Sequence, residues 1–350
     1  MATAVISQIQ RGTITMTGSY YDTTISAVDL TKTIVRFSSK ANGAVSVYDM
    51  AIYWQLTSST DLKFQRAGGT GTITVSYEVI SFSSGVTTQI GSNGMGAASE
   101  QIAITSTNLT KSWIEISWGR SSNIMDQSCF IRAQFNSATQ IQLDSLSAVG
   151  TTCNYVVVQY DNCSVQAVAI SNGNAQTFTQ SITSSSTSKT MLICSGEVHA
   201  TQTINQTMIY QTYLTNATTV TFTKYGSAGN GFDFNLFAIT FTDNNTVDHY
   251  TQSFVTGDTS NNLTVTSRAL ATTMHQQCWG TEWMMGGTND STDAGWHAEY
   301  CNFESVMTSA TNITLSRIST GYTSVITIQV INFPGTAPTN KKRQTLFFLN

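Results

Sequence analysis

The chain has 350 residues, enough for two to four domains, and its composition is unusual. Only 10% of the residues are charged, against roughly a quarter in an average globular protein, whereas 40% are hydrophobic. The net charge of −4 and the pI near 5.5 argue against a nucleic-acid-binding surface, which needs clustered lysine and arginine. We find neither a signal peptide nor the roughly 18 consecutive apolar residues of a membrane helix, so we expect no membrane insertion.

Threonine and serine take the place of the missing charges. Threonine is β-branched and suits a pleated, half-solvated surface, so its abundance favours strands. Disordered chains lack large apolar side chains, whereas this one has 16 Phe, 13 Tyr and 6 Trp with which to build a core. Because no stretch shows a sustained apolar period of 3.6 residues, we predict an all-β protein.

Four copies of one motif indicate a repeat protein. Each copy has an apolar residue, a short polar turn with a shared threonine, and an alternation of apolar and polar residues that is typical of a strand. The shared threonines are 79, 79 and 93 residues apart. The copies are Leu56 to Phe64, Phe135 to Leu143, Leu214 to Phe222 and Met307 to Leu315, with the shared threonine at Thr60, Thr139, Thr218 and Thr311.

A second alternating segment follows each motif and closes on an aromatic residue, 21 to 23 residues after the shared threonine. Because turns with glycine separate the two segments, we predict that they pair as a β-hairpin. The closing aromatic residues are Phe82, Tyr160, Phe241 and Phe333.

A polar turn ending in lysine precedes an apolar strand in the first three copies. Lys32, Lys111 and Lys189 each lie 28 or 29 residues before the shared threonine. The fourth copy is degenerate here, and its best counterpart is the segment 259–261. That assignment implies an insertion of roughly twenty residues, which a surface loop tolerates at little entropic cost.

These observations predict tandem antiparallel β-sandwich modules built from four repeats of about 80 residues. Two arrangements are compatible with the pattern: four small sandwiches, or two larger ones that each combine a pair of repeats. We assign 1–18 to an N-terminal arm, 19–84, 85–165, 166–243 and 244–335 to the repeats, with an insertion at 262–301 in the fourth, and 336–350 to a C-terminal tail.

The repeats resemble those of tailed-phage virion proteins, of the tail-appendage and head-decoration types. The first copy carries the resemblance in Gln10 to Thr15, Ile25 to Lys32, Leu56 to Arg66 and Val75 to Phe82, and the other copies follow it more loosely. The resemblance implies a β-rich structural role on the virion and brings no catalytic residues with it.

The insertion contains a set of residues with the chemistry of a zinc site. His275, Cys278, His297 and Cys301 form a Cys₂His₂ set with short spacings, although their order differs from that of common zinc fingers. The alternatives are a disulfide between the two cysteines or two buried thiols, and in either case no cofactor is needed. For Cys129, Cys153, Cys163 and Cys194 the spacing favours buried thiols.

Aromatic residues are concentrated in the same insertion. Exposed tryptophan and tyrosine side chains are common at binding surfaces, so the insertion is a candidate contact with a partner or receptor. Alternatively, these side chains form the core of an enlarged module. They are Trp279, Trp283, Trp296 and Tyr300.

The C-terminal tail ends in a short apolar segment that contains Leu346, Phe347 and Phe348. Such a segment is able to complete the sheet of a neighbouring molecule by strand addition, or to fold back on the fourth repeat. We regard it as a candidate assembly element.

The leading hypothesis is a non-enzymatic virion structural protein, made in the host cytoplasm, that assembles as a homo-oligomer with other virion proteins. It would stabilise the particle or attach it to a cell-surface receptor or glycan. The alternative is a polysaccharide-binding or polysaccharide-degrading tailspike, for which Glu282, Asp290, Asp293 and Glu299 are the only grouped carboxylates. The absence of a signal peptide disfavours a third possibility, a secreted bacterial adhesin.

Overall fold

The fold is that of a computed structural model, which describes residues 3–43, 50–66, 68–69, 71–120, 130–146, 150–172, 175–198, 210–224, 231–277, 303–318 and 324–333. In these ranges the protein is all-β, which confirms the predicted fold class, and its other regular elements are short 3-10 turns. No helix in the same ranges has the length and apolar character needed to cross a membrane.

The strands fall into four units of six. Unit 1 contains β1 (Val5–Met16), β2 (Tyr20–Thr24), β3 (Thr33–Ala41), β4 (Ile52–Ser58), β5 (Asp61–Arg66) and β6 (Ile73–Ser84). Unit 2 contains β7 (Val86–Met95), β8 (Ser99–Ala103), β9 (Ser112–Arg120), β10 (Arg132–Ser137), β11 (Gln140–Asp144) and β12 (Thr151–Tyr160). Unit 3 contains β13 (Cys163–Asn172), β14 (Thr177–Ser181), β15 (Thr190–Val198), β16 (Tyr210–Asn216), β17 (Thr219–Lys224) and β18 (Phe232–Phe241). Unit 4 contains β19 (Thr246–Phe254), β20 (Ser260–Thr264), β21 (Thr273–Gln277), β22 (Glu304–Ser309), β23 (Asn312–Ser316) and β24 (Ser324–Asn332).

Every unit repeats one topology of two three-stranded antiparallel sheets. In one sheet the sixth strand lies between the first and the third, and in the other the fifth strand lies between the second and the fourth. Each repeat therefore forms a small sandwich from its own strands. Of the two arrangements that the sequence left open, the structure has the one with four small sandwiches.

The predicted hairpin between the two alternating segments is wrong. In unit 1 those segments are β5 and β6, which belong to different sheets, and β5 pairs instead with β4 across the turn that contains the shared Thr60. The N–H of Thr60 donates to Ser58 Oγ at 3.2 Å, and the carbonyl of Thr60 accepts from the N–H of Ile25 at 2.9 Å. Equivalent contacts recur at Thr139, Thr218 and Thr311, with Asn216 Oδ1 as the side-chain acceptor in unit 3 and a serine Oγ in the other two. The repeated motif is thus a tight turn whose carbonyl also anchors the segment that follows the second strand.

The turn before each third strand is a single turn of 3-10 helix. Asp29 caps the first, because its carboxylate accepts from the N–H of Thr31 at 2.9 Å. In the first three units the turn ends in a lysine, and Lys189 Nζ reaches the junction after the sixth strand, where it donates to the carbonyl of Asp243 at 2.6 Å. The four turns are η1 (Leu30–Lys32), η3 (Leu109–Lys111), η5 (Thr187–Lys189) and η7 (Leu270–Thr272).

Unit 4 corrects two assignments made from the sequence. Its 3-10 turn is Leu270–Thr272, whereas the segment 259–261 lies where β20 begins. Residues 262–277 hold regular elements of the repeat, so the extra length of the fourth copy falls between Gln277 and Phe303, in 278–302, which lie outside the described residues.

The unit boundaries also differ from those expected. Residues 5–16, assigned to an N-terminal arm, form β1, which pairs with β6 along its whole length as the first strand of unit 1. The expected boundary at 165/166 falls inside β13, because unit 3 begins at Cys163. An arm and a first strand look alike in sequence when the pairing partner is about seventy residues away.

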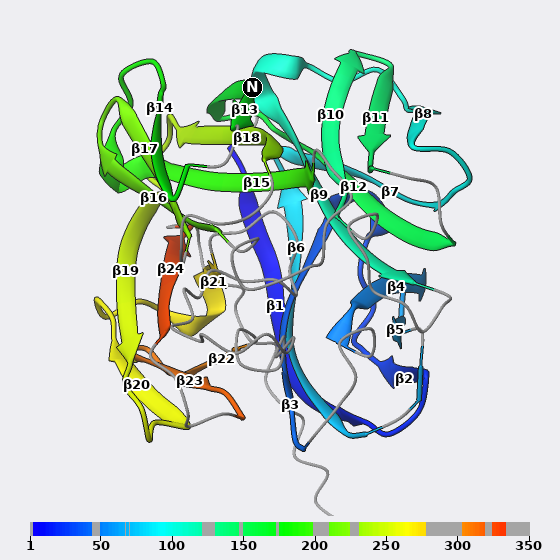
Figure 1. The fold of residues 1–350 in the computed structure, drawn as a ribbon, viewed down its shortest axis with the longest axis vertical. Coiled ribbons are helices and arrows are strands. Elements are labelled where there is room, and N and C mark those ends of the chain that lie inside the picture. The colour runs from blue at the N-terminus through cyan, green and yellow to red at the C-terminus, as the bar shows by residue number, and fades with distance from the viewer. Residues whose placement is uncertain are drawn as a thin grey trace, which may run out of the picture.

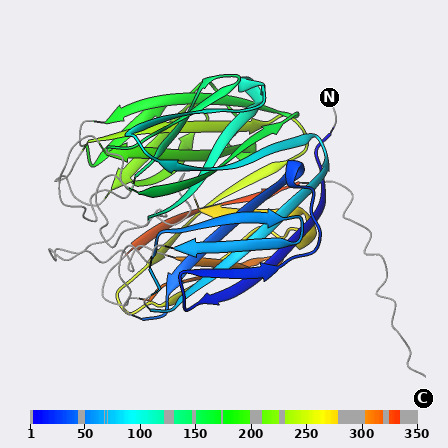
Figure 2. The same ribbon diagram turned by 90° about the vertical axis from the view of Figure 1, so that its right-hand side faces the viewer.

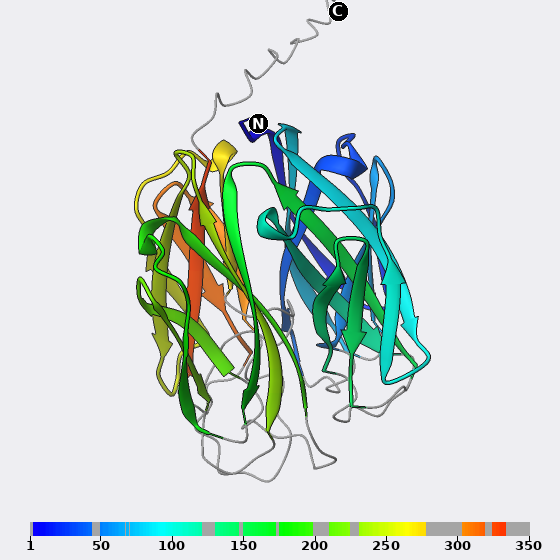
Figure 3. The same cartoon turned by 90° about the horizontal axis from the view of Figure 1, so that it is seen from above.

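The four units close into a ring. The fourth strand of each unit packs on the sheet of the next unit that contains its third and sixth strands, and unit 4 packs in the same way on unit 1. Figure 1 shows units 1 and 2 (blue to green) on the right and units 3 and 4 (green to red) on the left of a common centre, and Figure 3 shows the same two halves from above. The pairs are β4 on β9 and β12, β10 on β15 and β18, β16 on β24, and β22 on β3 and β6.

The 3-10 turns follow the same cyclic order. The turn of each unit contacts the first strand of the next, in the pairs η1 and β7, η3 and β13, η5 and β19, and η7 and β1. Seen from the side, the strands run between two faces of the ring (Figure 2). Because each third strand starts at its 3-10 turn, the four turns share one face and the four connections from third to fourth strand start at the other.

The closing aromatic residues meet at the centre of this ring. The ring centroids are 6.4 Å apart for Phe82 and Tyr160, 5.2 Å for Tyr160 and Phe241, 6.0 Å for Phe241 and Phe333, and 5.6 Å for Phe333 and Phe82. None of the four is more than 3% exposed. This cluster joins all four units at one point. Each aromatic pair in it contributes about 0.5–1.5 kcal/mol beyond the burial of its area.

Candidate functional site

The most distinctive chemistry of the described residues lies in the seams between units, which we number by the units they join. In the 1–2, 2–3 and 4–1 seams, the strand residue six positions before the shared threonine is a central contact. In the 1–2 seam this is Trp54, whose N–H donates to Ser117 Oγ at 3.5 Å and whose carbonyl accepts from Asn154 Nδ2. The residues at this position are Trp54, Ala133, Thr212 and Ser305.

The 2–3 seam repeats both contacts, and the 4–1 seam repeats the one between a backbone N–H and a serine. In the 2–3 seam the N–H of Ala133 donates to Ser195 Oγ at 3.0 Å, and Asn235 Nδ2 donates to the carbonyl of Ala133 at 3.0 Å. In the 4–1 seam the N–H of Ser305 donates to Ser38 Oγ at 2.9 Å. A serine in the third strand of one unit therefore satisfies the backbone of the fourth strand of the preceding unit.

A buried ion pair lies in the 1–2 seam. Arg36 NH2 is 2.7 Å from Glu115 Oε1, and both side chains are at most 8% exposed. Trp113 Nε1 also donates to Glu115 Oε1 at 2.6 Å. Burial raises the pKa of Glu115, and the Arg36 charge and the Trp113 hydrogen bond only partly offset this. The pair thus holds units 1 and 2 together at a desolvation cost.

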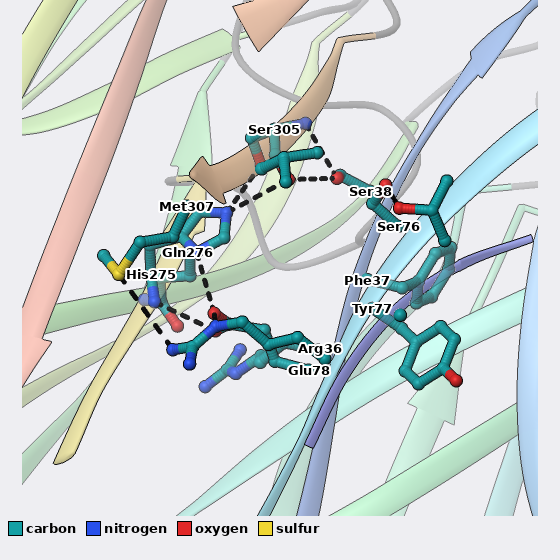
Figure 4. Close-up of a pocket in the computed structure, with 14 residues that line it drawn as sticks. Arg36, Phe37, Ser38, Ser76, Tyr77, Glu78, His275, Gln276, Ser305 and Met307 are labelled. Carbon is teal, nitrogen blue, oxygen red and sulfur yellow. Dashed lines mark hydrogen bonds and ion pairs between the residues drawn. The ribbon is translucent and has the colours of Figure 1, made fainter. Parts of the chain in front are cut away.

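The 4–1 seam is centred on the buried carboxylate of Glu78 (Figure 4). Glu78 Oε1 is 2.6 Å from Arg11 Nε and 3.1 Å from His275 Nδ1, and Glu78 Oε2 accepts from the N–H of His275 at 3.1 Å. Burial alone would raise the pKa of Glu78, but His275, through its charge and hydrogen bonds, and Arg11 outweigh it and lower that pKa to about 2. Two elements of unit 1 and one of unit 4 meet at this carboxylate.

A second polar contact of the 4–1 seam surrounds Glu304. Its Oε2 lies 2.9 Å from Lys40 Nζ, and its Oε1 accepts from Ser76 Oγ at 2.6 Å. Burial opposes ionisation here, but the hydrogen bond from Ser76 and the Lys40 ammonium lower the pKa of Glu304 overall. This seam therefore carries two carboxylates of low pKa.

A cavity of about 240 Å³ lies in the 4–1 seam. Its walls come from β1, β3 and β6 of unit 1 and from β21 and β22 of unit 4. They include Arg11, Arg36, Glu78, His275 and Gln276, together with the less polar Phe37, Tyr77 and Met307. Figure 4 shows the labelled wall residues of the two units on opposite sides of the hollow.

Packing in the wall of this cavity explains why the segment Gln10 to Thr15 has a glycine at Gly12. Gly12 lies opposite Tyr77 in the β1–β6 ladder, and a Cβ atom at this position would clash with the phenol group of Tyr77. Gly91 and Tyr155 stand in the same relation in unit 2. The glycine lets a tyrosine lie flat across the first strand of its unit.

Of the four residues of the predicted zinc set, His275 alone lies in the described part of the chain. Both of its ring nitrogens have partners, since Nε2 is 3.0 Å from Ser305 Oγ and Nδ1 faces Glu78. Cys278, His297 and Cys301 lie outside the described residues, and within the described ranges no group of three or more His, Cys, Asp and Glu side chains is arranged for a metal ion. The zinc site stays a prediction.

The other predicted site residues also lie outside the described ranges. These are Trp279, Trp283, Trp296 and Tyr300 of the insertion and Leu346, Phe347 and Phe348 of the tail. Among the remaining cysteines, Cys153, Cys163 and Cys194 are buried thiols, as expected.

Sequence reasoning missed the charged groups of the seams. Glu78 stands four residues before the closing aromatic, where the other units have Val156, Phe237 and Gln329. An alignment of the four copies would have singled out this glutamate, because it occupies a position that is apolar in two of the other three.

Comparison with known proteins adds no relative. No model of a protein family matches the chain, and no curated protein is similar to it in sequence.

Proposed function

We propose that this protein is a structural component of a tailed-phage virion that acts without catalysis. It stabilises the particle or attaches it to a host cell, as a capsid decoration protein or a tail appendage. The observation that carries the proposal is the closed ring, in which one chain places four equivalent sandwich units around a shared aromatic centre. Such a ring offers four similar surfaces to partners and holds them in fixed positions relative to one another.

The use of charge supports a structural role. The buried carboxylates of the described part, among them Glu78, Glu115 and Glu304, are paired with arginine or lysine across or beside a seam. Their partners hold the units together, and a carboxylate committed in this way is poorly placed to act as a general acid or base. These buried carboxylates therefore serve cohesion between units.

The outer surface suits contact with other proteins. The second strand of each unit lies at the edge of its sheet, so it leaves backbone groups open for pairing, and in units 2 and 3 it alternates exposed and half-buried residues. Tyr20, on β2 of unit 1, is 60% exposed, and Lys63 Nζ lies 4.9 Å from the centre of its ring. These edges are the surfaces through which we expect the protein to meet neighbouring virion subunits or further copies of itself.

The face at which the third-to-fourth connections start is the candidate receptor face. The third strand of every unit ends at this face, and the segment that follows the one in unit 4, 278–302, contains the tryptophans that the sequence assigns to partner contact. A cell-surface receptor or glycan is the expected target of this face.

The test is to locate the protein on purified particles. Phage particles from a lysate that contains the chain are banded by density, labelled with an antibody to the ring, and imaged, and the copy number is measured by quantitative mass spectrometry. Hundreds of copies over the shell support decoration, and a small symmetric number at the tail or one vertex supports an appendage. Recovery of the chain only in the soluble fraction overturns the proposal.

A further inference from the structure

We propose that the cavity in the 4–1 seam is a binding site for a small planar aromatic molecule, about the size of indole, with a hydrogen-bond donor on its edge. The proposal does not depend on the virion role. It rests on a comparison between two seams of the same ring.

The 1–2 seam has a hollow at the equivalent place. Its walls are Val35, Ile116, Ser117, Asn154, Val156 and Glu115, where the 4–1 seam has His275, Phe37, Ser38, Ser76, Glu78 and Arg36. The hollow measures about 10 Å³ in the 1–2 seam and about 240 Å³ in the 4–1 seam. The two seams therefore share one backbone arrangement, but side chains almost fill the hollow in the 1–2 seam and leave it open in the 4–1 seam.

The residue that differs most in size between the two sites is the central contact of the seam. Trp54 lines the small hollow, and Ser305 occupies the same position in the 4–1 seam, six residues before the shared threonine. Both residues donate their backbone N–H to the equivalent serine, so the backbone is in the same place. The space that an indole fills in one seam is open in the other.

The size of the cavity suits a bicyclic ring. A cavity of about 150 Å³ in a protein core is able to hold benzene, so about 240 Å³ leaves room for a fused pair of rings. Phe37, Tyr77 and Met307 supply apolar contacts, and the guanidinium groups of Arg11 and Arg36 lie in the same wall. Arginine favours the face of an aromatic ring.

Gln276, one of the residues that line the cavity, carries a buried polar atom that we infer orients the edge of the ligand. Gln276 is 6% exposed, and its Nε2 donates to the carbonyl of Leu192 at 3.1 Å. Its Oε1 is buried and accepts no hydrogen bond from the described part of the chain. A buried acceptor of this kind favours a ligand that brings an N–H or O–H group.

The experiment uses the full chain and 5-fluoroindole, with binding followed by broadening of the ¹⁹F signal. We expect saturable binding at one site, and roughly tenfold weaker binding of fluoroindene, which has the same shape without the N–H. Ser305→Trp should abolish binding because its side chain fills the cavity as Trp54 does. Thr308→Trp adds the same side chain at an exposed position of β22 and should leave binding unchanged.

A second variant keeps the test decisive if Ser305→Trp fails to fold. Gln276→Met removes the acceptor while preserving side-chain length, so the preference for fluoroindole over fluoroindene should disappear. The proposal is overturned if the wild type does not broaden the probe signal, which would mean a cavity that holds water alone. Binding that survives in folded Ser305→Trp, or a preference that survives in Gln276→Met, would likewise place the ligand elsewhere.

Discussion

The rings of Phe82 and Phe333 have centroids 5.6 Å apart, although 251 residues separate them in the chain. Phe82 lies near the end of β6, the sixth strand of unit 1, and Phe333 follows that of unit 4, so their contact joins the first unit to the last. Each also contacts Tyr160 of unit 2, and Phe333 contacts Phe241 of unit 3. The chain uses one residue per repeat to build a common core at the centre of the ring.

Truncation of this cluster should destabilise the whole ring. Phe333→Ala removes a buried ring that contacts units 1, 2 and 3, so we expect the free energy of unfolding to fall by about 3–5 kcal/mol. Chemical denaturation followed by tryptophan fluorescence measures the change. The control is Tyr20→Ala, an aromatic truncation at an exposed site, which should cost no more than about 1 kcal/mol. Equal losses in both variants would contradict the central role of the cluster.

The ion pair of the 1–2 seam should be costly to break and cheap to replace. Arg36→Met leaves Glu115 buried without its cationic partner and should cost about 3–5 kcal/mol of stability. The double variant Arg36→Met, Glu115→Leu should recover part of this loss, because unit 3 already has an apolar residue, Ile193, at the equivalent position, although Trp113 Nε1 then lacks its acceptor. Urea unfolding of the three proteins gives the comparison. A double variant as unstable as the single one would show that the charges are needed for the seam.

The 4–1 seam should make stability depend on pH in acid. The pKa of Glu78 is lowered from 4.5 to about 2 in the folded protein, so below pH 4.5 the unfolded chain binds a proton that the folded chain does not. The stabilisation is fully present above pH 4.5 and is lost as the pH falls towards 2. Glu78→Gln should therefore show a weaker loss of stability between these values, while Glu304, whose pKa is also lowered, keeps part of the slope. Urea midpoints measured across this range test it, and identical slopes in the two proteins would contradict it.

The buried thiols should be unreactive in the native protein. Burial raises the pKa of Cys163 to about 12 and raises that of Cys153 further, and Cys194 is only 1% exposed. Because the thiolate is the reactive form, alkylation of these three cysteines should require unfolding. Labelling with iodoacetamide with and without urea, followed by peptide mass spectrometry, reads each site separately. Native labelling of Cys153 as fast as in urea would refute the burial of β12.

The sequence predicts what is local in this fold. The motif around the shared threonine predicts a tight turn, and the alternating segments predict strands. The structure has that turn in each copy, with contacts equivalent to those that Thr60 makes with Ser58 and Ile25. The sequence does not show which strands pair with one another. The segments that became β5 and β6 are neighbours in the chain, yet they cross from one sheet to the other, and pairing between sheets cannot be inferred from spacing.

The same limit applies to the site. Glu78 lies in an alternating segment, where a glutamate ordinarily faces solvent. It is buried because β6 is the middle strand of its sheet and its other face is covered by unit 4, which begins more than 160 residues later. The ion pairs and the cavity of the seams depend on ring closure, and closure depends on contacts between the ends of the chain.

The most direct test of the ring is a nuclear Overhauser measurement on the full chain with labelled phenylalanine in a deuterated background. Signals of Phe82, Phe241 and Phe333 are assigned by single Phe→Leu substitutions, and dilution with unlabelled protein removes contacts between molecules. The account predicts cross-peaks within one molecule between Phe82 and Phe333 and between Phe241 and Phe333. Cross-peaks restricted to phenylalanines of the same unit would contradict the closed ring.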